Sequence, residues 1–267
     1  MVSKLLLVFL LLSTNLLAQN NCEVSKVYFN DNEEVSYHIQ YKWGLIWANA
    51  GEAKFTVAKT KIANKDYFHF KGEGNTYPSY DWLYKVRDKY ESYVDPVTFK
   101  PLRFFRDTDE GGKTLFDNNQ FYWHQNKVIS YQIRNGKNEK KDTTELKDCV
   151  FDVLTSIYQT RCINFDNISI NQKIPISMYL DNEIHDVYLR YLGVELLKTE
   201  NYGMVNCIKF SALLIEGTIF RSGESMTVWV TNDENRIPVY VETKIFVGKV
   251  KVWLKDTKNL KKPMKKL

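Results

Sequence analysis

The segment Lys-Val-Arg-Asp-Lys-Tyr-Glu at 85–91 holds the densest group of side chains that could do chemistry. In an extended strand, successive side chains point to opposite faces. Arg87 then lies among charged neighbours, whereas Asp88 shares its face with Val86 and Tyr90. Because an unpaired carboxylate is costly to bury on an apolar face, Asp88 needs a partner.

Three roles are open to Asp88. The favoured interpretation is a buried ion pair with Arg103 or Arg106, which follow on the next predicted strand. Alternatively, Arg87 and Asp88 bind the polar head of a ligand. In the third interpretation, Asp88 is a general acid or base whose pKa is shifted by its surroundings.

Glu91 and Asp233 are the other carboxylates that a hydrolase of envelope polymers could use. Asp233 lies in Thr-Asn-Asp-Glu-Asn-Arg between two alternating apolar runs, which is typical of a strand, a turn and a strand. Pro238 then fits the start of the second strand. Acid pairs in glycosidases stand roughly 5 to 9.5 Å apart across the sugar, a geometry that neighbours on one turn rarely adopt. We therefore predict no catalytic residue.

No pattern for a metal or a cofactor is present in the sequence. The histidines are scattered at His38, His69, His124 and His185, without another ligand at a recognised spacing. A glycine-rich phosphate loop and a nucleophile elbow are also missing. We predict neither a metal site nor a cofactor.

Aromatic residues gather around the first predicted turns. Core packing is the favoured role for such a group, and the alternative is a cavity for an apolar or carbohydrate ligand. The residues that would line this cavity are Trp43, Trp47, Tyr77, Trp82, Tyr84, Arg87 and Asp88.

These side chains must be positioned by strands. From Glu34 to Trp43 apolar and polar residues alternate without a fault, which predicts a half-buried antiparallel strand. Similar segments follow as far as residue 134 and again from 174 to 254. Turn residues such as Asp117-Asn-Asn separate these segments. We predict two separate strands at residues 184–192 and 195–200.

The segment 148–161 breaks this alternation, because its apolar residues recur at helical spacing. We predict one amphipathic helix there, with Asp148 as its N-cap. The fold class is mainly β: a strongly curved antiparallel sheet or incomplete β-barrel of about thirteen strands, with the helix on its concave side.

The first residues predict export. Residues 1–18 carry Lys4, eight apolar residues and a small residue at Ala18, which is typical of a cleavable signal peptide and too short to span a membrane. We expect a periplasmic or extracellular protein with no transmembrane segment. Cys22 follows Gln19-Asn-Asn, which is not the small apolar context of a lipid-anchored cysteine.

The formal charge of +5 is concentrated at the ends of the chain. Residues 255–267 contribute +5 and Lys4 adds +1, which leaves about −1 for the predicted single β-rich domain at 19–254. A nucleic-acid partner is therefore not expected. We predict that the basic tail at 255–267 is disordered, with a weak contact to anionic envelope surfaces as an alternative to a purely solubilising role.

Four cysteines, Cys22, Cys149, Cys162 and Cys207, allow three full pairings. Cys149 and Cys162 flank the predicted helix and would lie roughly 20 Å apart, beyond the reach of a disulfide. We therefore expect these two not to pair.

Several motifs occur in a fixed order along the chain. They are EVSYHI at 34–39, GEA at 51–53, YKVRD at 84–88, DVLTSIYQTR at 152–161, GTIF at 217–220, WVTNDENRIP at 229–238 and Gly248. Together they resemble the exported bacterial family catalogued as domain of unknown function 3108. The resemblance implies a β-rich periplasmic protein, commonly from Gram-negative bacteria, with no established activity. Its signature residues here are Arg87, Asp88, Asp152, Arg161, Asp233, Pro238 and Gly248.

Three functions remain open. The leading hypothesis is a non-enzymatic binding or carrier module for an apolar or envelope-derived ligand, by fold-level analogy with periplasmic lipoprotein carriers. The second is a structural or assembly factor of the envelope, which would have a filled interior. The third is a hydrolase acting on envelope polymers through Asp88, Glu91 or Asp233.

Overall fold

The structure is a computed structural model that describes residues 24–43, 46–215, 223–245 and 248–264. The predicted signal peptide at 1–18, Cys22, the motif at 217–220 and the Trp43 side chain lie outside what it describes. In the described part of the chain, no helix is long and apolar enough to span a bilayer.

Fifteen strands in the described ranges form one continuous sheet. The first half contains β1 (Glu34–Trp43), β2 (Ile46–Ile62), β3 (Lys65–Thr76), β4 (Val86–Val94), β5 (Pro101–Glu110), β6 (Lys113–Tyr122), β7 (Lys127–Arg134) and β8 (Asn138–Glu145). The second half contains β9 (Val150–Phe151), β10 (Lys173–Leu180), β11 (Glu183–Thr199), β12 (Gly203–Leu214), β13 (Gly223–Thr231), β14 (Pro238–Lys244) and β15 (Lys249–Lys258).

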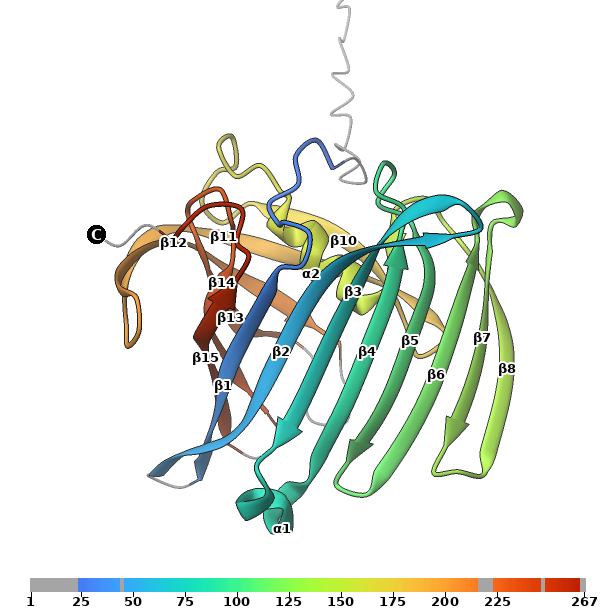
Figure 1. The fold of residues 1–267 in the computed structure, drawn as a ribbon, viewed down its shortest axis with the longest axis horizontal. Coiled ribbons are helices and arrows are strands. Elements are labelled where there is room, and N and C mark those ends of the chain that lie inside the picture. Colours follow the sequence, from blue (N-terminus) through green and yellow to red (C-terminus); the bar gives the residue numbers. More distant parts are fainter. Residues whose placement is uncertain (1–23, 44–45, 216–222, 246–247, 265–267) are drawn as a thin grey trace, which may run out of the picture.

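Each half is a meander, and pairing of β1 with β15 joins the two. In this pair Tyr37 stands opposite Leu254, and both side chains are buried. The first half ends at β8 and the second at β9, which pairs in parallel with β10, so the sheet is mixed and does not close. Figure 1 shows the sheet curled around α2 (Val153–Arg161), which packs against β3, β4 and β10. The predicted curved sheet with a helix on its concave side is confirmed.

The helix begins later than predicted. Asp152 caps α2 by accepting a hydrogen bond from the backbone N–H of Thr155 at 2.9 Å, and Val150–Phe151 form β9. Asp148 is therefore not the cap, because Cys149 has a left-handed backbone (φ 63°) that separates Asp148 from the helix. The remaining helical elements are short: η1 (Pro78–Tyr80), α1 (Asp81–Tyr84) and η2 (Trp123–Gln125).

Two predicted breaks in strands are wrong. Asp117-Asn-Asn lies inside β6 rather than in a turn. Residues 184–200 are nearly all one strand, β11, in which the register shifts between Tyr191 and Gly193. Gly193 has φ 99°, a backbone that glycine adopts without a steric penalty, and it marks a bulge rather than an end.

The predicted boundary at 254 falls within β15, which continues to Lys258. Beyond the strand, Leu260 and Met264 pack against the core that contains Tyr37. The backbone N–H of Lys262 donates to Asn235 Oδ1 at 3.0 Å. The prediction of a disordered tail is therefore wrong for residues 255–264, because apolar side chains and strand pairing hold them against the body.

An aromatic core fills the interior around α2. The rings of Phe70 and Tyr158 stack at 3.9 Å between centroids, and Phe29 makes edge contacts with both. Close packing of this kind excludes water and fixes the helix against the sheet. Cys149 is disulfide-bonded, whereas Cys162 and Cys207 are buried free thiols, so Cys149 and Cys162 do not pair, as expected.

Candidate functional site

The filled part of the interior ends between two glycines of β3. A Cβ atom on Gly72 would lie 3.2 Å from Leu154 of α2 and from Phe55 of β2. Two residues further along the same face, the Cβ of Asp88 is the only atom of the described residues within 4 Å of a Cβ atom built on Gly74, at an ordinary 3.9 Å. The helix therefore covers the concave face at Gly72 and leaves it uncovered at Gly74.

Asp88 stands on this uncovered wall. It pairs with Gly74 on one side and with Thr108 on the other, so the predicted inward direction of its side chain is confirmed. Its Oδ1 is buried without a hydrogen-bond partner. Burial and then the nearby charge of Glu110 raise the pKa of Asp88 to about 7. The carboxyl can therefore gain or lose a proton near neutral pH.

The predicted ion pair of Asp88 is wrong. Arg103 Nε donates to Asn118 Oδ1 at 2.8 Å instead. Arg106 Nη2 donates to Asp181 Oδ1 at 2.6 Å and to Asp117 Oδ2 at 3.1 Å. These two carboxylates neutralise the guanidinium, so Arg106 only partly offsets the rise in the pKa of Asp88.

The partner Asp181 comes from the tip of the β10–β11 hairpin. Asp181 and Asn182 have left-handed backbones, with φ 52° and 70°, which tight hairpin turns require. The tip reaches β5 and β7, because Arg134 Nη2 also donates to Asp181 at 3.2 Å and Asn182 Nδ2 donates to Gln132 at 3.3 Å. Burial would raise the pKa of Asp181, but Arg106 and Arg134 bring it below its usual value.

Several buried polar atoms on β5, β6 and the β10–β11 hairpin tip lack partners at hydrogen-bonding geometry. They are Arg106 Nε, Asn119 Oδ1 and Asn182 Oδ1. Such atoms are scarce in folded proteins, and each is normally satisfied by water or a ligand. The Asp117 carboxyl, by contrast, interacts with the side-chain amides of Gln132 and Asn119, which lower its pKa against the effect of burial. We define the inner polar wall as Asp88, Arg106, Thr108, Asp117, Asn119, Gln132, Asp181 and Asn182. Its unpartnered atoms can form hydrogen bonds with polar groups.

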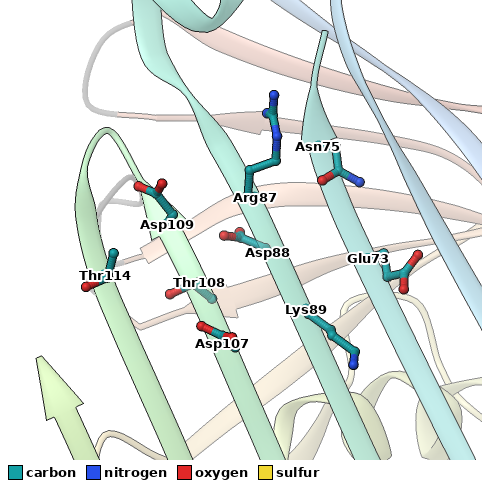
Figure 2. Close-up of a pocket in the computed structure, with 9 residues that line it drawn as sticks. All are labelled: Glu73, Asn75, Arg87, Asp88, Lys89, Asp107, Thr108, Asp109 and Thr114. Carbon is teal, nitrogen blue, oxygen red and sulfur yellow. The ribbon is translucent and has the colours of Figure 1, made fainter. Parts of the chain in front are cut away.

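A depression of about 450 Å³ lies around the same strands. Figure 2 shows its nine lining residues on β3, β4, β5 and β6. Most of them belong to the outer face, where opposite charges pair: Lys85 with Asp109 and Lys89 with Glu91, each at 2.8 Å. Exposed pairs of this kind contribute only about 0 to 1 kcal/mol. The depression is largely a solvated charged face, and it shares only Asp88 and Thr108 with the inner polar wall.

Arg87 and Asp88 do not form one site, because they point to opposite faces of β4. Arg87 Nη2 donates to Asp81 Oδ2 at 2.6 Å, and Nη1 donates to Thr76 Oγ1 at 3.1 Å. Asp81 is the first residue of α1. Arg87 therefore anchors α1 to the sheet.

The predicted aromatic residues are dispersed. Trp47 lies beneath Lys42 and Lys251, with ammonium-to-ring distances of 5.7 and 4.3 Å. Trp82 is 73% exposed on α1, and Tyr84 packs against the β5–β6 turn at Gly111. The backbone N–H of Tyr77 donates to Ala50 just before η1. The described members of the group do not line a common cavity.

The other candidate acids do not converge with Asp88. Glu91 faces outward and accepts one hydrogen bond from His69 Nε2 at 2.7 Å. Asp233 organises a turn by accepting from Thr231 Oγ1 at 2.6 Å and from the backbone N–H of Asn235 at 2.8 Å. The predicted strand, turn and strand at this segment is confirmed. Among the described residues, no cluster of histidine, cysteine and acidic side chains could hold a metal ion.

Asp152 and Arg161 fix the two ends of α2. Asp152 Oδ2 accepts from Ser92 Oγ of β4 at 2.6 Å, and burial raises its pKa to about 6. Arg161 donates to both carboxylate oxygens of Glu33, at 2.5 and 3.0 Å, and to the carbonyl of Asn235 at 2.7 Å. These residues hold the helix inside the curled sheet.

Pro238 and Gly248 have roles in the backbone. Pro238 is the first residue of β14, as predicted. Gly248 has φ 92°, and a Cβ atom there would lie 2.5 Å from the carbonyl oxygen of Lys42. Glycine is needed here both for the left-handed backbone and for the close approach of β1.

Residues 36–255 match the family described as "Protein of unknown function (DUF3108)". The chain belongs to the DUF3108 family. Among curated proteins, none matches this DUF3108 chain.

Two solved structures align with this DUF3108 chain, and one of them shares its fold. A beta-barrel-like protein of domain of unknown function DUF1849 from Brucella abortus aligns over 87% of this chain and 98% of its own, with a TM-score of 0.55 and 6% identity. A protein from Parabacteroides distasonis ATCC 8503, described as a candidate lipoprotein, aligns over 89% and 99% with a TM-score of 0.31 and 12% identity. The first likeness supports the barrel-like fold alone.

Most of the inner polar wall was not predicted. Asp117 and Asn119 looked like turn residues, although Leu115, Asp117, Asn119 and Phe121 continue the alternation of a strand. That alternation is the signal that could have found them. The contact between Asp181 and Arg106 joins residues far apart in the sequence, and no local pattern indicates it.

Proposed function

We propose that this DUF3108 protein is a non-enzymatic binding or carrier protein of the bacterial envelope. Its ligand combines an apolar body with a polar group and lies on the uncovered part of the concave face. The observation that carries the proposal is the space at Gly74 beside the buried, unpartnered Oδ1 of Asp88. A polar ligand group there would satisfy atoms that the chain leaves unsatisfied.

The opposite wall supplies an apolar surface. Strands of the second half of the sheet run behind β3–β5 in Figure 2. Met226, Val241 and Val252 on these strands are only partly buried, although they are paired with or adjacent to fully buried core residues. Ligand sites generally combine such apolar linings with a few polar groups that fix orientation.

Export to the periplasm is part of the proposal. The signal-peptide pattern at 1–18 supports it. The disulfide at Cys149 also supports it, because disulfides persist in oxidising compartments and are rare in the cytosol.

A structural or assembly role is the second candidate. The aromatic core and the Arg161–Glu33 pair give a rigid, well-filled body around α2, which suits a scaffold. This role needs no ligand on the inner polar wall. The two functions therefore differ in what is bound at Gly74.

Native mass spectrometry of the protein purified from its own envelope separates them. The Gly74→Leu variant fills the space beside Asp88, and Asn75→Leu places the same side chain on the outer face of the same strand. We expect the wild type and Asn75→Leu to carry an extractable organic molecule and Gly74→Leu to lose it. Wild-type protein that is empty, or a ligand that Gly74→Leu retains, would contradict the proposal.

A further inference from the structure

The end of the molecule away from α2 presents exposed apolar side chains. Trp82 of α1 is 73% exposed, and its neighbours Leu83 and Tyr84 are each 38% exposed. Ile46, the first residue of β2, is 72% exposed. Figure 1 shows α1 and the β1–β2 hairpin at the same end, which we call the α1 end.

These side chains are presented by a firmly held element. Asp81 of α1 accepts hydrogen bonds from Arg87 and from Thr76 Oγ1, the latter at 2.6 Å. The Tyr84 ring lies against Gly111, whose backbone N–H donates to the carbonyl of Lys85 at 2.8 Å. Their exposure is thus not a consequence of a loosely attached turn. Exposed apolar groups on an anchored element indicate an interaction surface.

The surrounding turns carry positive charge. Lysines stand in or beside the turns at this end: Lys42, Lys85, Lys113, Lys137, Lys244 and Lys249. Of the described acids at this end, Asp109, Glu242 and Glu224 are paired with Lys85, Lys249 and Arg190. Glu110 stands opposite Lys113, and Glu139 follows the turn that holds Lys137. Lys113, Lys137 and Lys244 form no ion pair within the described chain. Apart from the acids paired with arginines, six lysines face Asp109, Glu110, Glu139 and Glu242, so the α1 end keeps an excess of positive charge around exposed apolar residues.

We propose that the α1 end docks on an anionic lipid surface. Tryptophan and tyrosine favour the interface between headgroups and acyl chains, and leucine and isoleucine add apolar area buried there. Lysines near the surface are attracted by anionic headgroups within a Debye length. The chemistry that recognises this surface is thus a bilayer with acidic phospholipids. Docking places the Gly74–Asp88 wall, at the same end of β3 and β4, toward the membrane.

Vesicle sedimentation with the mature chain tests this surface. The vesicles contain phosphatidylcholine alone or phosphatidylcholine mixed with phosphatidylglycerol. We expect the wild type to bind the anionic vesicles. The double variant Trp82→Ser, Leu83→Ser should bind them with an affinity lower by about tenfold or more. The matched control is Val97→Ser, which removes a side chain that is 83% exposed in the β4–β5 turn at the opposite end. It should bind like the wild type, and added salt should weaken binding for both.

Other outcomes would overturn the proposal. Wild-type protein that does not sediment, or a double variant that binds as strongly as wild type, excludes docking through α1. Equal binding to neutral vesicles excludes the contribution of the lysines. A dimer in sedimentation velocity that the double variant abolishes, without vesicle binding, assigns the surface to a second copy of the chain. No ligand is needed in this assay, so it can fail or succeed independently of binding at the inner polar wall.

Discussion

Gly72 and Gly74 allow the boundary between the filled and the uncovered interior to be tested within one strand. Both are replaced by leucine, one variant at a time. The change from glycine to leucine alters the unfolded chain and the strand propensity similarly at the two positions, so these contributions largely cancel in the difference. What remains is packing on the concave face.

The expected difference follows from the surroundings of each position. At Gly72 even a Cβ atom would approach Leu154 and Phe55 to 3.2 Å, and three more carbons have to displace a core residue of α2. Overpacking of this kind costs about 1 to 3 kcal/mol. At Gly74 the Cβ of Asp88, at 3.9 Å, is the only atom of the described residues within 4 Å, so added atoms enter space that these residues leave uncovered.

Urea unfolding followed by tryptophan fluorescence measures both variants. We expect the free energy of unfolding to be lower for Gly72→Leu than for Gly74→Leu by about 1 to 3 kcal/mol. The midpoint of thermal unfolding should differ by roughly 2 to 10 °C for a chain of this size. Equal losses in the two variants would refute the reasoning, because they would show that the interior is packed alike at both glycines.

Three further variants test other parts of the structure. Arg161→Met leaves Glu33 buried without its partner and should lower the free energy of unfolding by about 3 to 5 kcal/mol in urea titrations; a loss below about 1 kcal/mol would contradict the role of this pair. Because the folded-state pKa of Asp88 is about 7, above its usual 3.8, its contribution to stability is fully present below about pH 4 and is lost as the pH rises toward 7. Asp88→Asn should therefore flatten the decline in the urea midpoint over this range, and an unchanged decline would argue against a raised pKa. Gly248→Ala forces a Cβ atom to 2.5 Å from the Lys42 carbonyl at a positive φ and should cost about 1 to 3 kcal/mol, whereas a neutral result would show that β1 can move away.

The strands and the helix were largely predictable because burial on one face leaves a periodic pattern. Val35 and Tyr37 alternate with polar residues in the sequence and are buried together in the structure. The start of α2 was missed because Asp148 and Asp152 are both suitable caps, and the left-handed backbone at Cys149 decides between them. Such a backbone depends on the whole fold rather than on local sequence preference.

The candidate site was only partly predictable. Alternation correctly placed Asp88 on the inner face, but its neighbours depend on how strongly the sheet curls. Asp181, at the tip of the β10–β11 hairpin, reaches Arg106 across the interior. It pairs with the guanidinium that we had predicted to pair with Asp88. Residues joined only by tertiary structure carry no spacing signal, so neither this contact nor the uncovered space at Gly74 could have been inferred.

A crystal structure of the protein purified from its own envelope tests the central claim most directly. We predict electron density for an organic molecule on the concave face, with a polar atom at hydrogen-bonding distance from Asp88 and apolar atoms over Gly74. Density for ordered water alone, or protein side chains filling this space, would contradict a binding function at the inner polar wall.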